Sequence, residues 1–165
     1  VELEAADTVG GGGSGRGAAP ARARRGAAGK ARVLLAEADP VFRQAVAARL
    51  RAEGYEVLEA EDGQMLIRTL ILGLEREGRV PELIISAVEM PGCTGLEVLA
   101  RVRRIGWSTP FILLSDAGEA AAYGEAERLG ATFVLDKPTE AEAVACAALV
   151  LVEPVPALAQ SLRQE

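Results

Sequence analysis

The sequence predicts an α/β sandwich in which helices cover both faces of one doubly wound parallel sheet. Five short apolar runs alternate strictly with five helical patterns, which is typical of parallel strands joined by right-handed crossovers. The clearest run is ELIISAVEMPG at 82–92. Its continuous hydrophobicity and its stop at Pro91-Gly92 favour a central strand, covered on both faces, over a piece of buried helix.

The first strand and helix are predicted from residues 33–36 and a cap that follows them. Asp39 suits the N-cap position and Pro40 suits the first helical position. Gly54 is expected to close the helix. The apolar residues at helical spacing are Phe42, Val46 and Leu50.

The next unit pairs an edge strand with a long helix. Residues 55–60 alternate in polarity more than the first strand does, so we expect that strand nearer the sheet edge. Asp62-Gly63 turns into a helix that Gly78 ends. Its predicted apolar side consists of Met65, Leu66, Leu70, Ile71 and Leu74.

The remaining elements repeat this scheme. Thr94 is predicted to cap a helix that finishes near Gly106, and the last helix is expected to start at Thr139 or Glu140 and to reach about Val152. Between them, strands are predicted at 110–115 and 132–135, and a helix at 119–129.

Composition divides the chain into three parts. The Gly-, Ala- and Arg-rich residues 1–30 cannot bury enough apolar area to offset their conformational entropy, so a disordered tail is predicted there. Residues 31–153 form the predicted domain, and 154–165 a C-terminal tail. Residues 1–30 carry a net charge of +2 in a chain of net charge −6. The acidic domain therefore argues against direct binding of nucleic acid.

The reactive residue types exclude several classes of site. The chain has no histidine, which excludes the usual catalytic triads and most zinc sites. Cys93 and Cys146 lack metal-like spacing, and we expect them to be reduced thiols in a cytoplasmic protein. No apolar stretch is long enough to span a bilayer, so no membrane contact is expected.

Five motifs, in order and spacing, carry a family resemblance. They are VLLAEADP (33–40), AEDG (60–63), MPGCTGLE (90–97), PFILLS (110–115), and GA (130–131) followed by LDKP (135–138). Residues 32–152 resemble the receiver domain of bacterial response regulators in two-component signalling. The resemblance implies a flavodoxin-like, CheY-like fold with strand order 2-1-3-4-5.

The resemblance also implies a phosphorylation site at the carboxyl ends of the strands. In receivers, an aspartate after the third strand accepts a phosphoryl group from a histidine kinase, and two acidic residues after the first strand help to hold Mg²⁺. A Ser or Thr and a Lys bind the phosphoryl oxygens. Glu37 matches the first acidic residue, and Ser115 and Lys137 match the phosphate contacts.

This sequence departs from that pattern at two places that carry the chemistry. Ala87 stands at the phosphoacceptor position and Ala38 at the second acidic position. A methyl group can neither accept phosphate nor bind a metal, so we expect Mg²⁺ binding to be lost or weak and no cofactor to be required. Val134 replaces the aromatic switch residue, and Asp116 stands where a small residue is usual. Glu89 belongs to a variant motif that competent receivers also contain.

We therefore interpret the chain as a pseudo-receiver, a non-enzymatic module that acts through protein–protein interaction. Its expected partners are a histidine kinase or a downstream signalling protein. The apolar excess at 143–151 also predicts a homodimer through the last two helices and the strand between them. Two alternatives stay open. One is an engineered Asp-to-Ala form of a phosphoaccepting regulator, and the other is a flavodoxin-like domain that binds a small molecule.

Lys137 carries a further expectation. A lysine before proline at this place sits in a cleft, and its charge there needs a partner. We expect Lys137 to bond Asp116, Glu37 or both.

Overall fold

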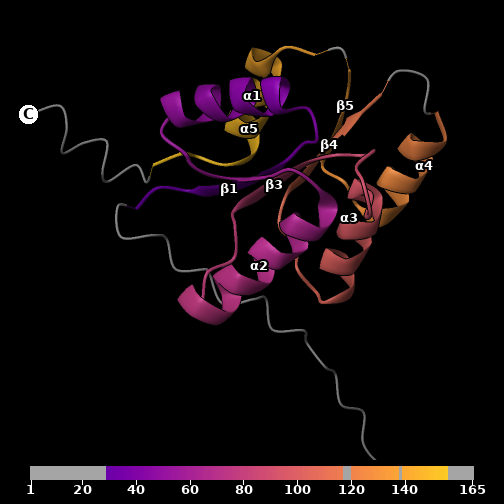
Figure 1. Cartoon of the computed structure of the whole chain (residues 1–165), viewed down its shortest axis with the longest axis horizontal. Helices are drawn as coiled ribbons and strands as arrows, with labels where there is room; N and C mark the ends of the chain where they lie inside the picture. Colours follow the sequence, from indigo (N-terminus) through magenta and orange to yellow (C-terminus); the bar gives the residue numbers. More distant parts are fainter. Residues whose placement is uncertain (1–28, 117–119, 138, 156–165) are drawn as a thin grey trace, which may run out of the picture.

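The computed structural model describes residues 29–116, 120–137 and 139–155. Strands and helices alternate strictly in this part of the chain (Figure 1), as the hydrophobic pattern predicts. Their bounds are β1 Arg32–Ala36, α1 Pro40–Ala52, β2 Glu56–Ala60, α2 Gly63–Glu77, β3 Leu83–Ala87, α3 Gly95–Arg104, β4 Phe111–Ser115, α4 Ala120–Leu129, β5 Phe133–Asp136 and α5 Ala141–Leu151. The predicted helix start at residue 119 lies outside the described residues, and so do 1–28 of the predicted tail 1–30 and 156–165 of the predicted tail 154–165.

The five strands form one parallel sheet in the order β2-β1-β3-β4-β5. This confirms the flavodoxin-like order that the resemblance implies. β3 is the central strand and is buried throughout, whereas the edge strand β2 is only partly buried. The difference explains why 82–92 reads as continuously apolar and 55–60 as alternating.

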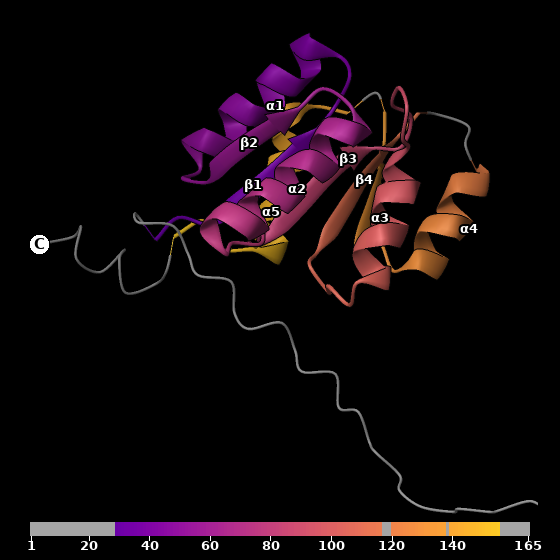
Figure 2. The same ribbon diagram turned by 60° about the horizontal axis from the view of Figure 1, so that its bottom comes forward.

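Helices cover both faces of the sheet (Figures 1 and 2). On one face, α1 and α5 pack over a core that includes Val33, Leu35 and Ile85. On the other face, α2, α3 and α4 pack over a core that includes Leu34, Ile84 and Leu113. Among the described residues, no helix is both long enough and apolar enough to cross a bilayer.

The predicted caps position the helices. The Asp39 side chain accepts hydrogen bonds from the backbone N–H groups of the first turn of α1, and Asp62 does the same for α2. Thr94 and Glu97 form a reciprocal capping box at the start of α3. Gly95 lets α3 approach β3 closely, because a Cβ there would lie 2.2 Å from the Ala87 carbonyl oxygen.

The predicted apolar side of α2 is wrong in part. Leu66 and Leu70 are buried, but the exposed fractions of Met65, Ile71 and Leu74 are 42%, 49% and 45%. Only a narrow stripe of α2 is buried, and it consists of Gly63, Leu66, Leu70 and Gly73. The apolar pattern of the helix is wider than this stripe, so its remaining residues face a neighbouring helix or the solvent.

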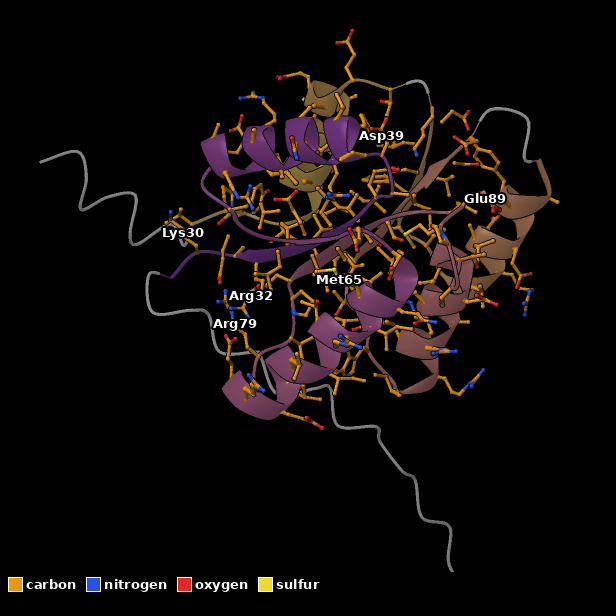
Figure 3. The ribbon with its side chains drawn as sticks, in the orientation of Figure 1. Lys30, Arg32, Asp39, Met65, Arg79 and Glu89 are labelled. Atoms are coloured by element: carbon orange, nitrogen blue, oxygen red, sulfur yellow. The ribbon has the colours of Figure 1, made fainter. Side chains whose placement is uncertain are left out.

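Two buried arginines form an ion-pair cluster at the opposite end of the sheet from the caps (Figure 3). Arg32 Nη2 lies 2.7 Å from Glu56 Oε1 and 2.8 Å from Glu77 Oε2. Arg79 also pairs with Glu56 and donates a 2.8 Å hydrogen bond to the carbonyl oxygen of Lys30. The cluster therefore joins the starts of β1 and β2 to the end of α2, a link that the sequence pattern does not predict.

Candidate functional site

The residues singled out by sequence gather at one edge of the sheet. Glu37 follows β1, Ala87 ends β3, Ser115 ends β4, and Lys137 follows β5. Because all five strands are parallel, their carboxyl ends lie at the same edge. The topology therefore brings together residues up to a hundred positions apart in the chain.

Glu37 is buried and held on several sides. Its Oε1 accepts a 3.0 Å hydrogen bond from the Asp39 backbone N–H, and its carbonyl oxygen accepts a 2.7 Å hydrogen bond from Arg43 Nη1. Its Oε2 lies 2.6 Å from Lys137 Nζ. The exposed fraction of the Glu37 side chain is 3%, so its negative charge is balanced inside the protein rather than by water.

Lys137 is the cationic partner in this site. Its backbone N–H donates a 2.7 Å hydrogen bond to the Ser115 carbonyl oxygen, which fixes the turn after β5 beside the end of β4. Its Nζ lies 5.7 Å from the centre of the Phe42 ring and pairs with Glu37. The predicted pairing of Lys137 with an acidic side chain is confirmed for Glu37.

Asp116 is the other acidic residue expected to pair with Lys137. It is exposed, and no ion pair found within the described residues joins it to Lys137. Its carbonyl oxygen accepts a 3.2 Å hydrogen bond from Ser115 Oγ. Lys137 thus reaches past the nearer strand ends to the buried carboxylate after β1, because that carboxylate has lost more water than an exposed one.

The two alanines supply no side-chain oxygen where the resemblance expects a phosphoacceptor and a metal ligand. Ala87 is buried, with 1% of its surface exposed, whereas Ala38 is exposed. Glu37 is the one acidic side chain retained, and its carboxylate is engaged by Asp39 N–H and Lys137. Mg²⁺ prefers several oxygen ligands in octahedral geometry. The residues at this place do not fit that ion, and within the described ranges no three His, Cys, Asp or Glu side chains are grouped to hold a metal.

The other predicted site residues lie around this centre. Ser115 is fully buried at the end of β4. Val134 is half-buried and packs against the core under α2, α3 and α4, so the switch-equivalent position contributes to packing. Glu89 is exposed in the turn after β3, which places its carboxylate on the surface of the protein.

A cavity of about 390 Å³ opens beside Lys137. Its lining residues are Asp39, Phe42, Asp116, Lys137 and Thr139. The sequence pattern predicts Phe42 on the apolar face of α1 and Thr139 at a helix start, but it does not predict that either residue lines a cavity. Their positions in the chain could have indicated this role. Phe42 lies in the first turn after Asp39, and Thr139 directly follows Lys137-Pro138.

A family model for the response regulator receiver domain matches residues 33–148. The chain belongs to this family. Its fold and the positions of its site loops are those of a receiver domain, a signalling module of two-component systems.

Receivers of known structure agree with this assignment. The chemotaxis protein CheY4 of Vibrio cholerae is 30% identical, with a TM-score of 0.64 over 74% of this chain and 99% of that one. A receiver domain from Clostridium thermocellum, 23% identical with a TM-score of 0.64, covers 73% of this chain and 93% of its own and supports the fold.

Longer regulators contain a similar segment. The transcriptional regulatory protein DltR of Streptococcus agalactiae is 32% identical over 111 residues, which are 67% of this chain and 47% of DltR. The Regulator of RpoS of Escherichia coli is 32% identical over 108 residues, or 66% of this chain and 30% of that protein. The receiver therefore spans about half or less of the length of these curated relatives.

Proposed function

We propose that this receiver is a pseudo-receiver, which takes part in two-component signalling through protein–protein contacts and without phosphorylation. The observation that carries the proposal is the combination of Ala87 and Ala38 with the ion pair between Glu37 and Lys137. The first two residues lack phosphoacceptor and metal-ligand oxygens. The ion pair occupies the two charged groups that a competent receiver would use on Mg²⁺ and phosphate.

The ion pair supplies a physical basis for a constant signalling state. In a competent receiver, the phosphoryl group draws the conserved Lys and the Ser or Thr into a second loop arrangement. Here Lys137 already has an anionic partner at 2.6 Å, so the turns after β1 and β5 are joined without a ligand. Such a link biases the loops toward one arrangement, which a partner protein can recognise.

The partners that we propose are a histidine kinase or a downstream signalling protein, and a second copy of the chain. The proposed homodimer surface consists of α4, β5 and α5. Phe133, Leu149 and Val150 are large apolar residues exposed on β5 and α5, with exposed fractions of 36%, 39% and 75%. Covering such residues in an interface would remove apolar surface from water.

Phosphorylation is the direct test. The chain is incubated with acetyl phosphate and Mg²⁺, or with a histidine kinase, and its intact mass is measured. We expect an unchanged mass. The matched control is the variant Ala38→Asp/Ala87→Asp, in which both missing carboxylates are restored and a phosphoryl adduct is expected. A stoichiometric adduct on the unmodified chain would overturn the proposal.

A further inference from the structure

Helices α2 and α3 lie next to one another on the face of the sheet away from α1 and α5 (Figure 2). An apolar groove runs between their side chains. Its volume is about 250 Å³. The residues that form most of its walls are Ile67, Ile71 and Leu74 from α2, and Val102, Ile105 and Trp107 from α3 and its C-terminal turn. Ile71, Leu74 and Ile105 are 49%, 45% and 61% exposed. These side chains form a contiguous exposed apolar surface, and such surfaces are typical of sites that bind another protein segment.

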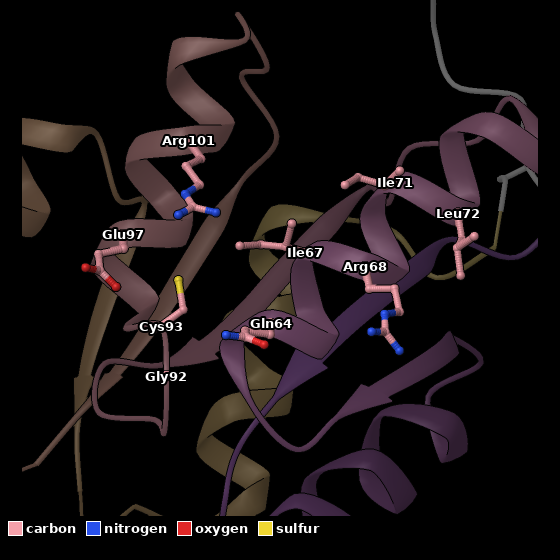
Figure 4. A pocket seen from close by; sticks show the side chains of 9 residues that line it. All are labelled: Gln64, Ile67, Arg68, Ile71, Leu72, Gly92, Cys93, Glu97 and Arg101. Atoms are coloured by element: carbon pink, nitrogen blue, oxygen red, sulfur yellow. The ribbon is translucent and has the colours of Figure 1, made fainter.

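The groove continues toward the turn after β3 (Figure 4). Ile67, Ile71 and Arg101 line both the groove and a hollow beside Gln64 and Cys93. Figure 4 shows Arg101 pointing from α3, and Ile67 from α2, into the space between the helices. The two hollows together form one continuous surface along both helices.

Two arginines and two glutamates border this surface. Arg68 and Arg101 line the hollow, and neither lies within ion-pair distance of an acidic side chain in the described ranges. The hydrogen bond from the Thr94 backbone N–H lowers the pKa of the Glu97 carboxyl, and the charge of Arg101 nevertheless acts on that carboxyl and helps to lower its pKa. Of the two glutamates that line the surface, Glu97 accepts a 2.9 Å hydrogen bond from the Thr94 backbone N–H in the capping box, whereas Glu75 is exposed. The apolar walls suit an apolar occupant, and acidic residues on that occupant would find Arg68 without an acidic neighbour and Arg101 partly balanced by Glu97.

We propose that residues 1–9 of the same chain dock in this groove. Their sequence, VELEAADTV, combines apolar Val1, Leu3 and Val9 with Glu2, Glu4 and Asp7. The segment carries a net charge of −3 in a region that is otherwise basic. Its apolar side chains fit the groove walls, and its carboxylates complement Arg68 and Arg101.

The chain enters the domain at a place that permits this contact. The carbonyl oxygen of Lys30 is held by Arg79, two residues after the end of α2 (Figure 3). Leu74, near the same end of α2, lines the groove. A Gly-rich linker as long as residues 10–29 has a root-mean-square span of about 25 Å, and a helix as long as α2 measures about 22 Å. The tether therefore reaches the whole groove and raises the local concentration of the segment.

Trp107 is a built-in reporter, because it lines the groove and is the only tryptophan in the chain. The test compares the fluorescence of the full chain with that of a chain lacking residues 1–9. We expect the deletion to move the emission maximum to longer wavelength and to increase quenching by acrylamide. A synthetic peptide of residues 1–9, added in excess to the shortened chain, should reverse both changes.

Single substitutions separate docking from other effects of the deletion. Leu3→Ser should act like the deletion, whereas the conservative Thr8→Ser should leave the spectrum of the full chain unchanged. Arg101→Glu should also act like the deletion, and Glu4→Arg in the same chain should restore part of the effect. Because these changes lie in the tail or on an exposed helix position, far-UV circular dichroism should be constant across the series.

Two results would overturn the proposal. Identical emission and quenching in the full and shortened chains would show that residues 1–9 do not cover Trp107. A difference that grows with protein concentration would assign the groove to the tail of a second copy. Neither result bears on phosphorylation, so this proposal and the pseudo-receiver proposal fail independently.

Discussion

Lys137 Nζ lies 2.6 Å from Glu37 Oε2, although β3 and β4 separate the two strands that these residues follow. The pair closes the site across the carboxyl edge of the sheet. Its two members are unequal, because the side chain of Glu37 is 3% exposed and that of Lys137 is 22% exposed. The buried carboxylate therefore depends on the lysine more than the lysine depends on the carboxylate.

This inequality predicts the effect of Lys137→Met. The substitution leaves a buried charge without its partner, and we expect it to lower the free energy of unfolding by about 2 kcal/mol in urea denaturation. Glu37→Gln/Lys137→Met removes both charges and should be less destabilised than the single variant. Equal losses in the two variants would show that Glu37 does not rely on Lys137.

Restoring the missing carboxylates should restore metal dependence in two steps. Ala87→Asp alone supplies a phosphoacceptor but not the second acidic group after β1, so weak labelling by acetyl phosphate is expected. Ala38→Asp/Ala87→Asp places three carboxylates together, which repel one another without a cation. The melting temperature of the double variant should therefore rise with Mg²⁺ concentration, as expected for a ligand that binds the folded state. A melting temperature that does not respond to Mg²⁺ would mean that the site geometry has diverged beyond these two residues.

The buried Tyr55 should make the free energy of unfolding depend on pH in the alkaline range. Burial, with a smaller contribution from the charge of Glu53, raises the pKa of Tyr55 to about 12. The hydroxyl donates a hydrogen bond to the carbonyl oxygen of Val152. Because an unfolded tyrosine has a pKa of about 10, the contribution of Tyr55 to stability is fully present below pH 10 and is lost as the pH rises toward 12.

The variant Tyr55→Phe isolates this effect. We expect it to cost about 1 kcal/mol at neutral pH through loss of the hydrogen bond, and less at pH 11. Urea denaturation of both proteins at pH 7 and pH 11 gives the difference directly. A constant difference between the two pH values would contradict the raised pKa.

The arginine cluster at the other end of the sheet predicts a large stability loss on truncation. Arg79 is 4% exposed, and its removal by Arg79→Leu leaves Glu56 and the Lys30 carbonyl oxygen with one partner fewer. We expect a loss of about 3 kcal/mol in the free energy of unfolding. Arg76→Leu, at an exposed position near the end of α2, is the matched control and should change stability by less than about 0.5 kcal/mol.

The proposed homodimer predicts an effect of Val150→Glu. Val150 is 75% exposed on α5, so a charge there should not disturb folding but should disfavour burial in an interface. Light scattering over a range of concentrations should show dimers for the unmodified chain and monomers for the variant. A strictly monomeric unmodified chain at high concentration, together with unchanged binding of any partner, would exclude this surface.

The sequence alone determined the order and type of the elements, because these depend on short-range physics. The buried β3 appears as an unbroken apolar run, and Asp39, Asp62 and Thr94 cap helices whose first turns lie within three residues of them. The family motifs and the two alanines that interrupt them are also local. The placement of Glu37, Ala87, Ser115 and Lys137 at one edge then followed from a parallel sheet.

Only the tertiary structure decided which of these groups touch. Asp116 and Glu37 were both expected as partners of Lys137, and the structure pairs the lysine with the buried carboxylate of Glu37, since burial depends on packing from all sides. For the same reason, the sequence does not predict that Ile71 and Leu74 of α2 are exposed or that Arg79 joins an ion-pair cluster. Apolar periodicity shows that a helix has a face to bury, but which residues the sheet covers is set by where the neighbouring elements pack.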